Sequence, residues 1–310
     1  MRTVALFCTV LSIGCAAPAY VSGLRVAPAL NPALAHDEGR FDGKDGVSLF
    51  EESWRPTTQA KAVLVMVHGL KDHADRYAVL AEAAVEKGYA VYAFDLRGHG
   101  DSDGDRVWVD SFDDYLADLK IFLERVRAKE PNKPLFLFGH SMGGAIVTLY
   151  TLTEKPALAG LLLSAPALKP GEDVSGFLIG VTKMLGSLTP TLAVLELDDN
   201  AFSRDPQVVA EMKADPLVYQ GKGPARTAKE LLKALARIDE AMEQLTVPLF
   251  IMHGTQDKLT NPAGSEALQQ RAASTDKTLK RYEGLFHDLI HEPEKKQVMS
   301  DLLTWLDAHG

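Results

Sequence analysis

A serine between two glycines, with an apolar stretch on each side, constrains this 310-residue chain more than any other feature. Residues 139–143 (GHSMG) fit the pattern G-x-S-x-G. The apolar residues 134–138 predict a buried strand before the pattern, and residues 145–150 predict a buried helix after it. The glycines lack the Cβ atoms that would collide with this strand and helix, and the sharp turn exposes the serine hydroxyl. A glycine-rich turn without chemistry is the alternative. We predict that Ser141 is a nucleophile.

A nucleophilic serine that attacks a carbonyl needs donors for the oxyanion that forms. The N-terminus of the helix after Ser141 offers such donors, and the backbone N–H of Met142 is the first candidate. The second candidate comes from the loop after the first central strand, residues 62–68, which gives the N–H of Leu70. His68 and Gly69 are expected to shape that loop.

The serine also needs a base, and the base needs an acid that orients it. Asp257 follows the apolar strand 247–253 and is predicted to lie at the carboxyl edge of the sheet as the acid. A turn aspartate with only a local hydrogen bond is the alternative. His287 is predicted as the base because it follows Asp257 in the chain and lies on a loop. His291 is a weaker candidate base, and Asp288 a weaker candidate acid because it adjoins His287.

Apolar strand patterns alternate with helical patterns along most of the chain. This alternation predicts an α/β fold with a mostly parallel central sheet flanked by helices on both faces. Residues 41–54 predict an antiparallel hairpin, and residues 167–246, without a convincing strand, predict an inserted helical cap. The further strands are expected at 89–95, 160–166 and 277–282, and the helices at 77–87, 112–129, 228–244, 263–273 and 296–308.

The N-terminus predicts export. Residues 1–14 combine a positive start with a short apolar run, which is typical of a signal peptide. Cys15 follows in a sequence like a bacterial lipoprotein box, and residues 17–19 offer an ordinary cleavage site as the alternative. Residues 15–39 are expected to be a tether, the core to comprise 40–166 and 247–310, and the cap 167–246. The protein is expected at the cell envelope as a lipoprotein, or otherwise in the periplasm or secreted.

Composition excludes several other functions. The net charge of −9 without a basic run argues against a nucleic-acid partner. No cluster of histidine, cysteine and carboxylate residues has metal-ligand spacing, and no glycine loop fits a phosphate, so we expect neither metal nor cofactor. His140 is expected to pack in the core, and Arg97 and His99 to hold a turn. No stretch approaches the roughly 20 apolar residues of a membrane span.

Several segments together resemble a known family, the monoacylglycerol lipase and lysophospholipase branch of the α/β-hydrolases, which is similar to serine aminopeptidase S33. The resemblance covers residues 40–310 and implies the triad Ser141, Asp257 and His287 with the oxyanion donors Leu70 and Met142. The matching segments are 68–70 (HGL), 76–77 (RY), 95–102 (DLRGHGDS), 139–144 (GHSMGG), 253–257 (HGTQD), 284–287 (GLFH), and in the cap 203–206 (SRDP) and 215–218 (DPLV).

The expected reaction is cofactor-free hydrolysis of a carboxylic ester through an acyl-serine, with monoacylglycerols or lysophospholipids as substrates. Apolar cap residues 174–188 and 192–197 are expected either to form an entrance for an acyl chain or to pack on the core. A lipid on Cys15 would hold the enzyme at a membrane surface where such substrates partition. The alternatives are hydrolysis of small aryl or other non-lipid esters or amides, a haloperoxidase-like side activity, and a non-catalytic binding scaffold.

Overall fold

The N-terminal part of the fold begins earlier than the sequence predicts. The structure, a computed structural model, describes residues 34–170 and 176–310. The predicted signal peptide, Cys15 and the tether up to residue 33 lie outside these residues. Strand β1 (Leu34–Asp42) occupies the end of the predicted tether 15–39, so the tether prediction is wrong for residues 34–39. These residues pair antiparallel with β2 (Ser48–Pro56). Many of their side chains are polar, so the sequence shows no apolar strand pattern there.

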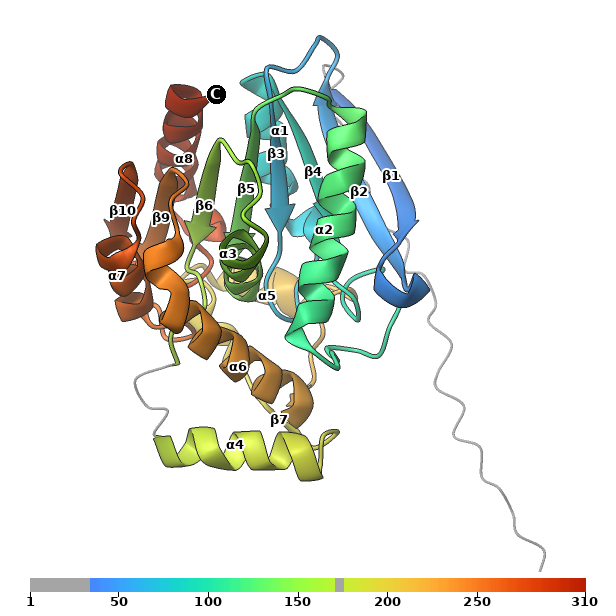
Figure 1. The fold of residues 1–310 in the computed structure, drawn as a ribbon, viewed down its shortest axis with the longest axis vertical. Coiled ribbons are helices and arrows are strands. Elements are labelled where there is room, and N and C mark those ends of the chain that lie inside the picture. The colour runs from blue at the N-terminus through green and yellow to red at the C-terminus, as the bar shows by residue number, and fades with distance from the viewer. Residues whose placement is uncertain (1–33, 171–175) are drawn as a thin grey trace, which may run out of the picture.

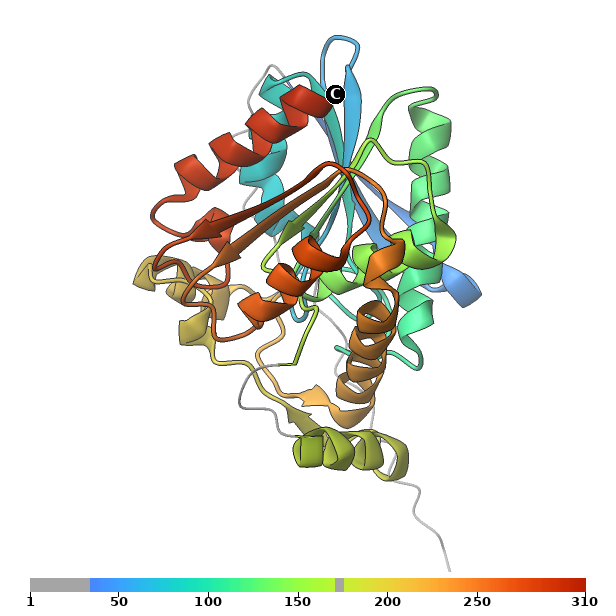
Figure 2. The ribbon, with the colours of Figure 1, turned by 60° about the vertical axis from the view of Figure 1, so that its left-hand side comes forward.

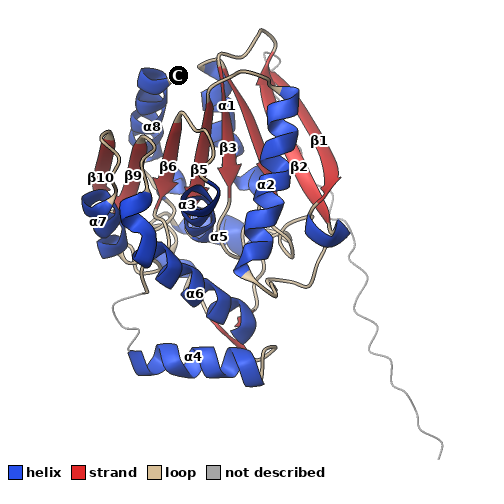
Figure 3. Cartoon of the chain, viewed as in Figure 1, coloured by secondary structure: helices blue, strands red, loops and turns tan. Residues whose placement is uncertain are grey.

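One eight-stranded sheet forms the centre of the molecule, in the order β1-β2-β4-β3-β5-β6-β9-β10. The first two strands run antiparallel to their neighbours, and the other six are parallel, which confirms the predicted α/β fold. Figure 3 shows these strands between two layers of helices. The remaining strands are β3 (Ala62–Val67), β4 (Tyr89–Phe94), β5 (Leu135–His140), β6 (Gly160–Ser164), β9 (Leu249–Gly254) and β10 (Lys277–Tyr282).

Helices cover both faces of the sheet, as parallel strands require. On one face α2 (Phe112–Lys129), α3 (Met142–Glu154) and α7 (Pro262–Arg271) bury their apolar sides, as does α6 (Ala225–Ala241). On the other face α1 (Ala78–Glu86) and α8 (Lys295–His309) do the same. Figure 2 shows the two layers on either side of the strands. Strands β3, β4 and β5 are buried along their whole length, which explains their continuous apolar runs.

The segment between β6 and β9 forms the cap. It contains α4 (Gly176–Leu188), α5 (Pro206–Ala214) and α6 (Ala225–Ala241), and α4 and α6 lie beyond the carboxyl ends of the strands (Figure 1). The prediction of a cap without strands is wrong, because β7 (Ala193–Leu195) pairs with β8 (Gly223–Pro224). Three and two residues are too few to show a period-2 pattern. Among the described residues, no helix is both long and apolar enough to cross a membrane.

Candidate active site

Ser141 has a strained backbone at the junction of β5 and α3. Its φ of 54° and ψ of −120° lie where residues with a Cβ are rarely found. The end of β6 and the loop after it hold this conformation, because Ser141 N–H donates to the carbonyl of Ser164 at 3.0 Å, and Ala167 N–H donates to the carbonyl of Ser141 at 2.9 Å. Strain of this kind persists only where the surroundings fix it, and it is found at functional sites.

The two glycines of the turn permit backbone to approach backbone. A Cβ on Gly143 would lie 2.2 Å from the carbonyl oxygen of Val67 and 2.4 Å from that of His68. A Cβ on Gly139 would lie 2.5 Å from the carbonyl oxygen of Gly143. The start of α3 therefore lies directly against the end of β3, and no larger residue fits at either position.

The loop after β3 passes beside the serine. A Cβ on Gly69 would lie 3.2 Å from the Cβ of Ser141. His68 shapes this loop, since its Nδ1–H donates to the carbonyl of Gly69 at 2.7 Å and its Nε2 accepts from Leu96 N–H at 2.9 Å. Burial lowers the pKa of His68 to about 4, so this neutral tautomer persists. Leu70 follows at once, beside the predicted nucleophile.

Met142 is the first residue of α3, so its N–H lacks an acceptor within the helix. Leu70 follows Gly69, which lies beside Ser141. The N–H groups of Leu70 and Met142 remain predicted donors.

Asp257 and His287 meet at the carboxyl edge of the sheet. Nδ1 of His287 lies 2.8 Å from Oδ2 of Asp257, and both side chains are almost completely buried. Burial favours neutral imidazole, but the charge and hydrogen bond of Asp257 outweigh it and raise the pKa of His287 above its ordinary value. Ser141 adjoins this pair through its neighbour His140, whose ring centroid lies 4.7 Å from that of His287.

The carboxylate of Asp257 has more partners than the sequence predicts. Oδ1 accepts from the backbone N–H groups of Leu259 at 2.8 Å and Thr260 at 3.0 Å. Oδ2 accepts from the hydroxyl of Thr260 at 2.8 Å and contacts Nε2 of His253 at 3.1 Å. Neither Thr260 nor His253 was predicted as part of the site, because only the fold of the chain after β9 brings their side chains to Asp257.

Comparison with known proteins identifies the family. Residues 58–294 match the family model of serine aminopeptidase, S33. The chain belongs to this family. It is 39% identical to the monoacylglycerol lipase of Mycolicibacterium smegmatis over 272 residues, which is 88% of this chain and 97% of that protein. It is 35% identical to the caffeoylshikimate esterase of Arabidopsis thaliana over 288 residues, covering 88% and 86% of the two chains.

A solved structure extends the likeness to three dimensions. The crystal structure of Paleococcus ferrophilus monoacylglycerol lipase superimposes with a TM-score of 0.77 at 30% identity, covering 84% of this chain and 99% of that one. The α/β-hydrolase fold and the prediction of a carboxylic ester hydrolase are confirmed.

The weaker candidates in this S33 hydrolase have other partners. Asp288 forms an ion pair with Arg76 at 2.7 Å and contacts Nδ1 of His291 at 2.9 Å. Nε2 of His291 lies 2.9 Å from the carbonyl oxygen of Arg76. Despite its burial, the charges of His291 and Arg76 hold the pKa of Asp288 well below its ordinary value. Arg76, Asp288 and His291 therefore stabilise the loop that carries His287.

The predicted structural residues are found in structural roles. His140 is buried, and burial together with the nearby His287 lowers its pKa to about 4. Nε and one terminal nitrogen of Arg97 donate to the two oxygens of Asp118 at 2.6 and 2.8 Å. Nδ1 of His99 lies 2.9 Å from the carbonyl oxygen of Arg97, where it holds the turn after β4.

The structure brings together one group of potential metal ligands, although the sequence shows no cluster with metal-ligand spacing. His36, Glu38 and Glu52 offer ligand atoms within 4.8 Å of one another in the described part of the chain. They lie on β1 and β2, at the edge of the sheet and several strands from Ser141. His36 and Glu52 contact each other at 3.2 Å, so the group acts as an ion pair of the hairpin.

Proposed function

We propose that Ser141, His287 and Asp257 form a catalytic triad that hydrolyses monoacylglycerol-like esters. The observation that carries this proposal is the 2.8 Å contact between His287 and Asp257 beside a serine in a strained strand-to-helix turn. Serine, base and acid also follow one another in the chain order expected for this fold. The names of the similar lipases support a monoacylglycerol as the substrate.

The geometry supports a two-step acyl transfer. Nε2 of His287 accepts the hydroxyl proton as Oγ of Ser141 attacks the ester carbonyl carbon. The N–H groups of Leu70 and Met142 stabilise the oxyanion, and each such donor contributes about 3–4 kcal/mol. The imidazolium returns the proton to the departing alcohol. A water molecule then gives a proton to His287 and attacks the acyl-serine, and the imidazolium returns this proton to Oγ of Ser141 as the fatty acid leaves.

The cap closes tightly over the catalytic histidine. The ring of Phe202 packs edge-on against that of His287 at 5.6 Å, and Asp288 N–H donates to the carbonyl of Phe202 at 2.8 Å. Phe202 also lines a small cavity together with Leu70.

The triad is tested by the Ser141→Ala variant, with Ser300→Ala on the exposed side of α8 as the matched control. We expect Ser141→Ala to lose both fluorophosphonate labelling and hydrolysis of a monoacylglycerol, while Ser300→Ala keeps both. Turnover retained by a folded Ser141→Ala variant would overturn the triad.

The substrate class is tested with a monoacylglycerol, a lysophospholipid, p-nitrophenyl acetate and an aminoacyl amide. We expect kcat/KM to be at least about tenfold higher for the monoacylglycerol than for the others. The caffeoylshikimate esterase among the relatives makes an aryl ester the second candidate. A higher kcat/KM for the aryl ester would replace the lipid assignment with that one.

We also propose that the protein is exported and anchored to a membrane by a lipid on Cys15. The cysteine directly after the apolar run of residues 1–14 supports this proposal. In a bacterial host, Cys15→Ser should shift the protein from the membrane fraction to the soluble fraction, with Cys8→Ser as the control. An unchanged membrane fraction for Cys15→Ser would contradict the anchor.

A further inference from the structure

A second imidazole contacts the oxygen of Asp257 that binds the catalytic base. Nε2 of His253 lies 3.1 Å from Oδ2 of Asp257, and Nδ1 of His287 lies 2.8 Å from the same atom. The side chain of His253 is only 1% exposed, so this contact is largely removed from solvent. Hydrogen bonds to a buried carboxylate are stronger than those in water, so this contact restrains Asp257 effectively.

A hydroxyl group on α7 orients His253 in turn. Nδ1 of His253 lies 2.7 Å from Oγ of Ser265, which is completely buried. A carboxylate only accepts hydrogen bonds, so Nε2–H of His253 donates to Asp257. Nδ1 of His253 and the Ser265 hydroxyl share the next hydrogen bond. Ser265, His253, Asp257 and His287 therefore form one continuous chain of hydrogen bonds.

We propose that His253 is a positioning residue that fixes the carboxylate of Asp257 for its contact with His287. This inference rests on the proposed triad. The turn holds Oδ1 through two backbone N–H groups, whereas side chains alone hold Oδ2. Without His253, only the hydroxyl of Thr260 and the base His287 itself contact Oδ2. The carboxylate of Asp257 can then rotate more freely.

This role predicts a specific kinetic effect. If Asp257 is misaligned, the imidazole of His287 is not held in the orientation that proton transfer from Ser141 requires. The barrier of the chemical step then rises. Substrate binding should not change, because the buried side chain of His253 contacts Asp257 and Ser265. Loss of the contact should therefore lower kcat and leave KM unchanged.

The test compares His253→Gln with His253→Asn in hydrolysis of a monoacylglycerol. The terminal amide of glutamine falls near the position of Nε2 and can donate to Asp257, whereas the shorter asparagine reaches only the position of Nδ1. We expect His253→Gln to keep kcat within about threefold and His253→Asn to lower it about 10–100-fold, as when the supporting partners of metal ligands are removed. KM should stay within about twofold for both variants. Equal kcat values for the two folded variants would overturn the proposal.

Two further variants complete the test. His36→Asn removes a comparable contact, between Nε2 and Glu52 at 3.2 Å, at the far edge of the sheet and should leave kcat unchanged. If His253→Asn does not fold, Ser265→Ala replaces it, and an unchanged kcat there overturns the proposal. The experiments distinguish failure of the triad from failure of the positioning role. Activity retained by Ser141→Ala refutes the triad. An inactive Ser141→Ala variant together with equal kcat values for the two His253 variants refutes only the positioning role.

Discussion

At the scale of single residues, the charges around His287 determine when it can act as a base. Burial would lower its pKa, but the charge and hydrogen bond of Asp257, and the charges of Asp288 and Asp72, raise it. His140, whose ring packs against that of His287, is neutral at ordinary pH and adds no opposing charge. The base must be neutral to accept a proton, so activity rises as the pH passes upward through this raised pKa.

The acid limb of the profile of kcat/KM against pH should therefore lie above about pH 6.5, the ordinary pKa of histidine. Asp257→Asn removes the charge that raises this pKa, so the limb should move to lower pH. The variant should also lose about 10⁴-fold in kcat, because an amide can stabilise the wrong tautomer of the base. The measurement is kcat/KM of a soluble ester between about pH 5 and 9, with the exposed Asp110→Asn as control. A wild-type limb at or below pH 6.5 contradicts this assignment.

At the scale of elements, the approach of α3 to β3 positions the nucleophile. Gly143→Ala places a methyl group 2.2 Å from the carbonyl oxygen of Val67, and this backbone atom cannot move aside without shifting β3. We expect a loss of about 3 kcal/mol or more in the free energy of unfolding, together with loss of fluorophosphonate labelling.

Gly180→Ala in α4 is the matched control for Gly143→Ala. A Cβ at Gly180 has no atom within 4 Å, so helix propensity alone should increase stability by about 0.5–1 kcal/mol. Urea unfolding measures both variants. Equal stabilities for Gly143→Ala and wild type would show that the turn tolerates a wider separation of α3 from β3.

The sequence predicts those elements whose pattern is strong and local. Strands β3, β4 and β5 are continuous apolar runs because both of their faces are buried, and Ser141 lies in a motif that is contiguous in the chain. The antiparallel hairpin was predicted, but only from residue 41, and residues 34–40 of β1 were missed because an edge strand is partly exposed and carries polar residues. The contact of His253 with Asp257 could not be predicted, since it depends on how the turn after β9 folds back rather than on residue type.

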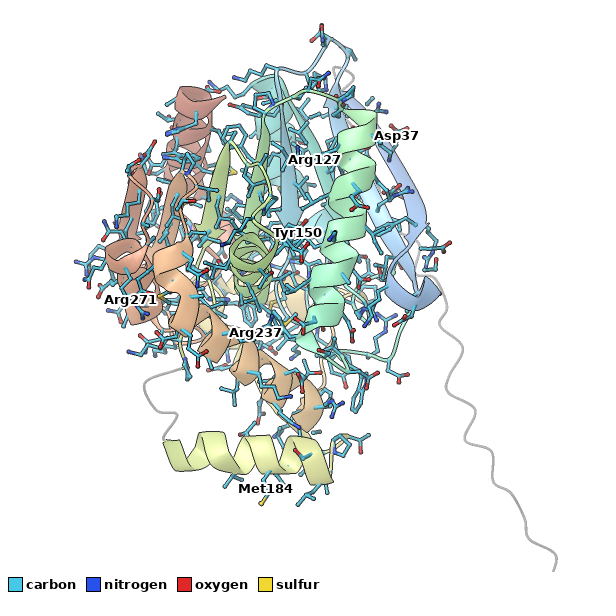
Figure 4. The ribbon with its side chains drawn as sticks, in the orientation of Figure 1. Asp37, Arg127, Tyr150, Met184, Arg237 and Arg271 are labelled. Carbon is cyan, nitrogen blue, oxygen red and sulfur yellow. The ribbon has the colours of Figure 1, made fainter. Side chains whose placement is uncertain are left out.

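At the scale of the whole molecule, the cap presents apolar side chains to the surroundings. Met184, Leu188 and Leu192 are 52%, 73% and 47% exposed, and all three belong to the cap. Met184 points away from the body of the enzyme (Figure 4). Exposed apolar side chains that cluster on one element mark a surface for binding other apolar material. We expect this surface to contact lipid aggregates, because the proposed substrate resides in them.

Replacing Met184 and Leu188 together by glutamine should therefore weaken the action on lipid aggregates and spare the chemistry. Each half-exposed side chain offers about 1 kcal/mol of apolar burial, so the double variant should raise the apparent KM for monoacylglycerol in vesicles about tenfold or more. Hydrolysis of soluble p-nitrophenyl acetate should not change, because the triad lies at the sheet edge and not on α4. Val79→Gln is the control, because Val79 is 38% exposed and lies on α1, outside the cap. An equal rise in KM for the control, or an equal loss on the soluble ester, would assign the effect to general destabilisation and remove the cap from the lipid contact.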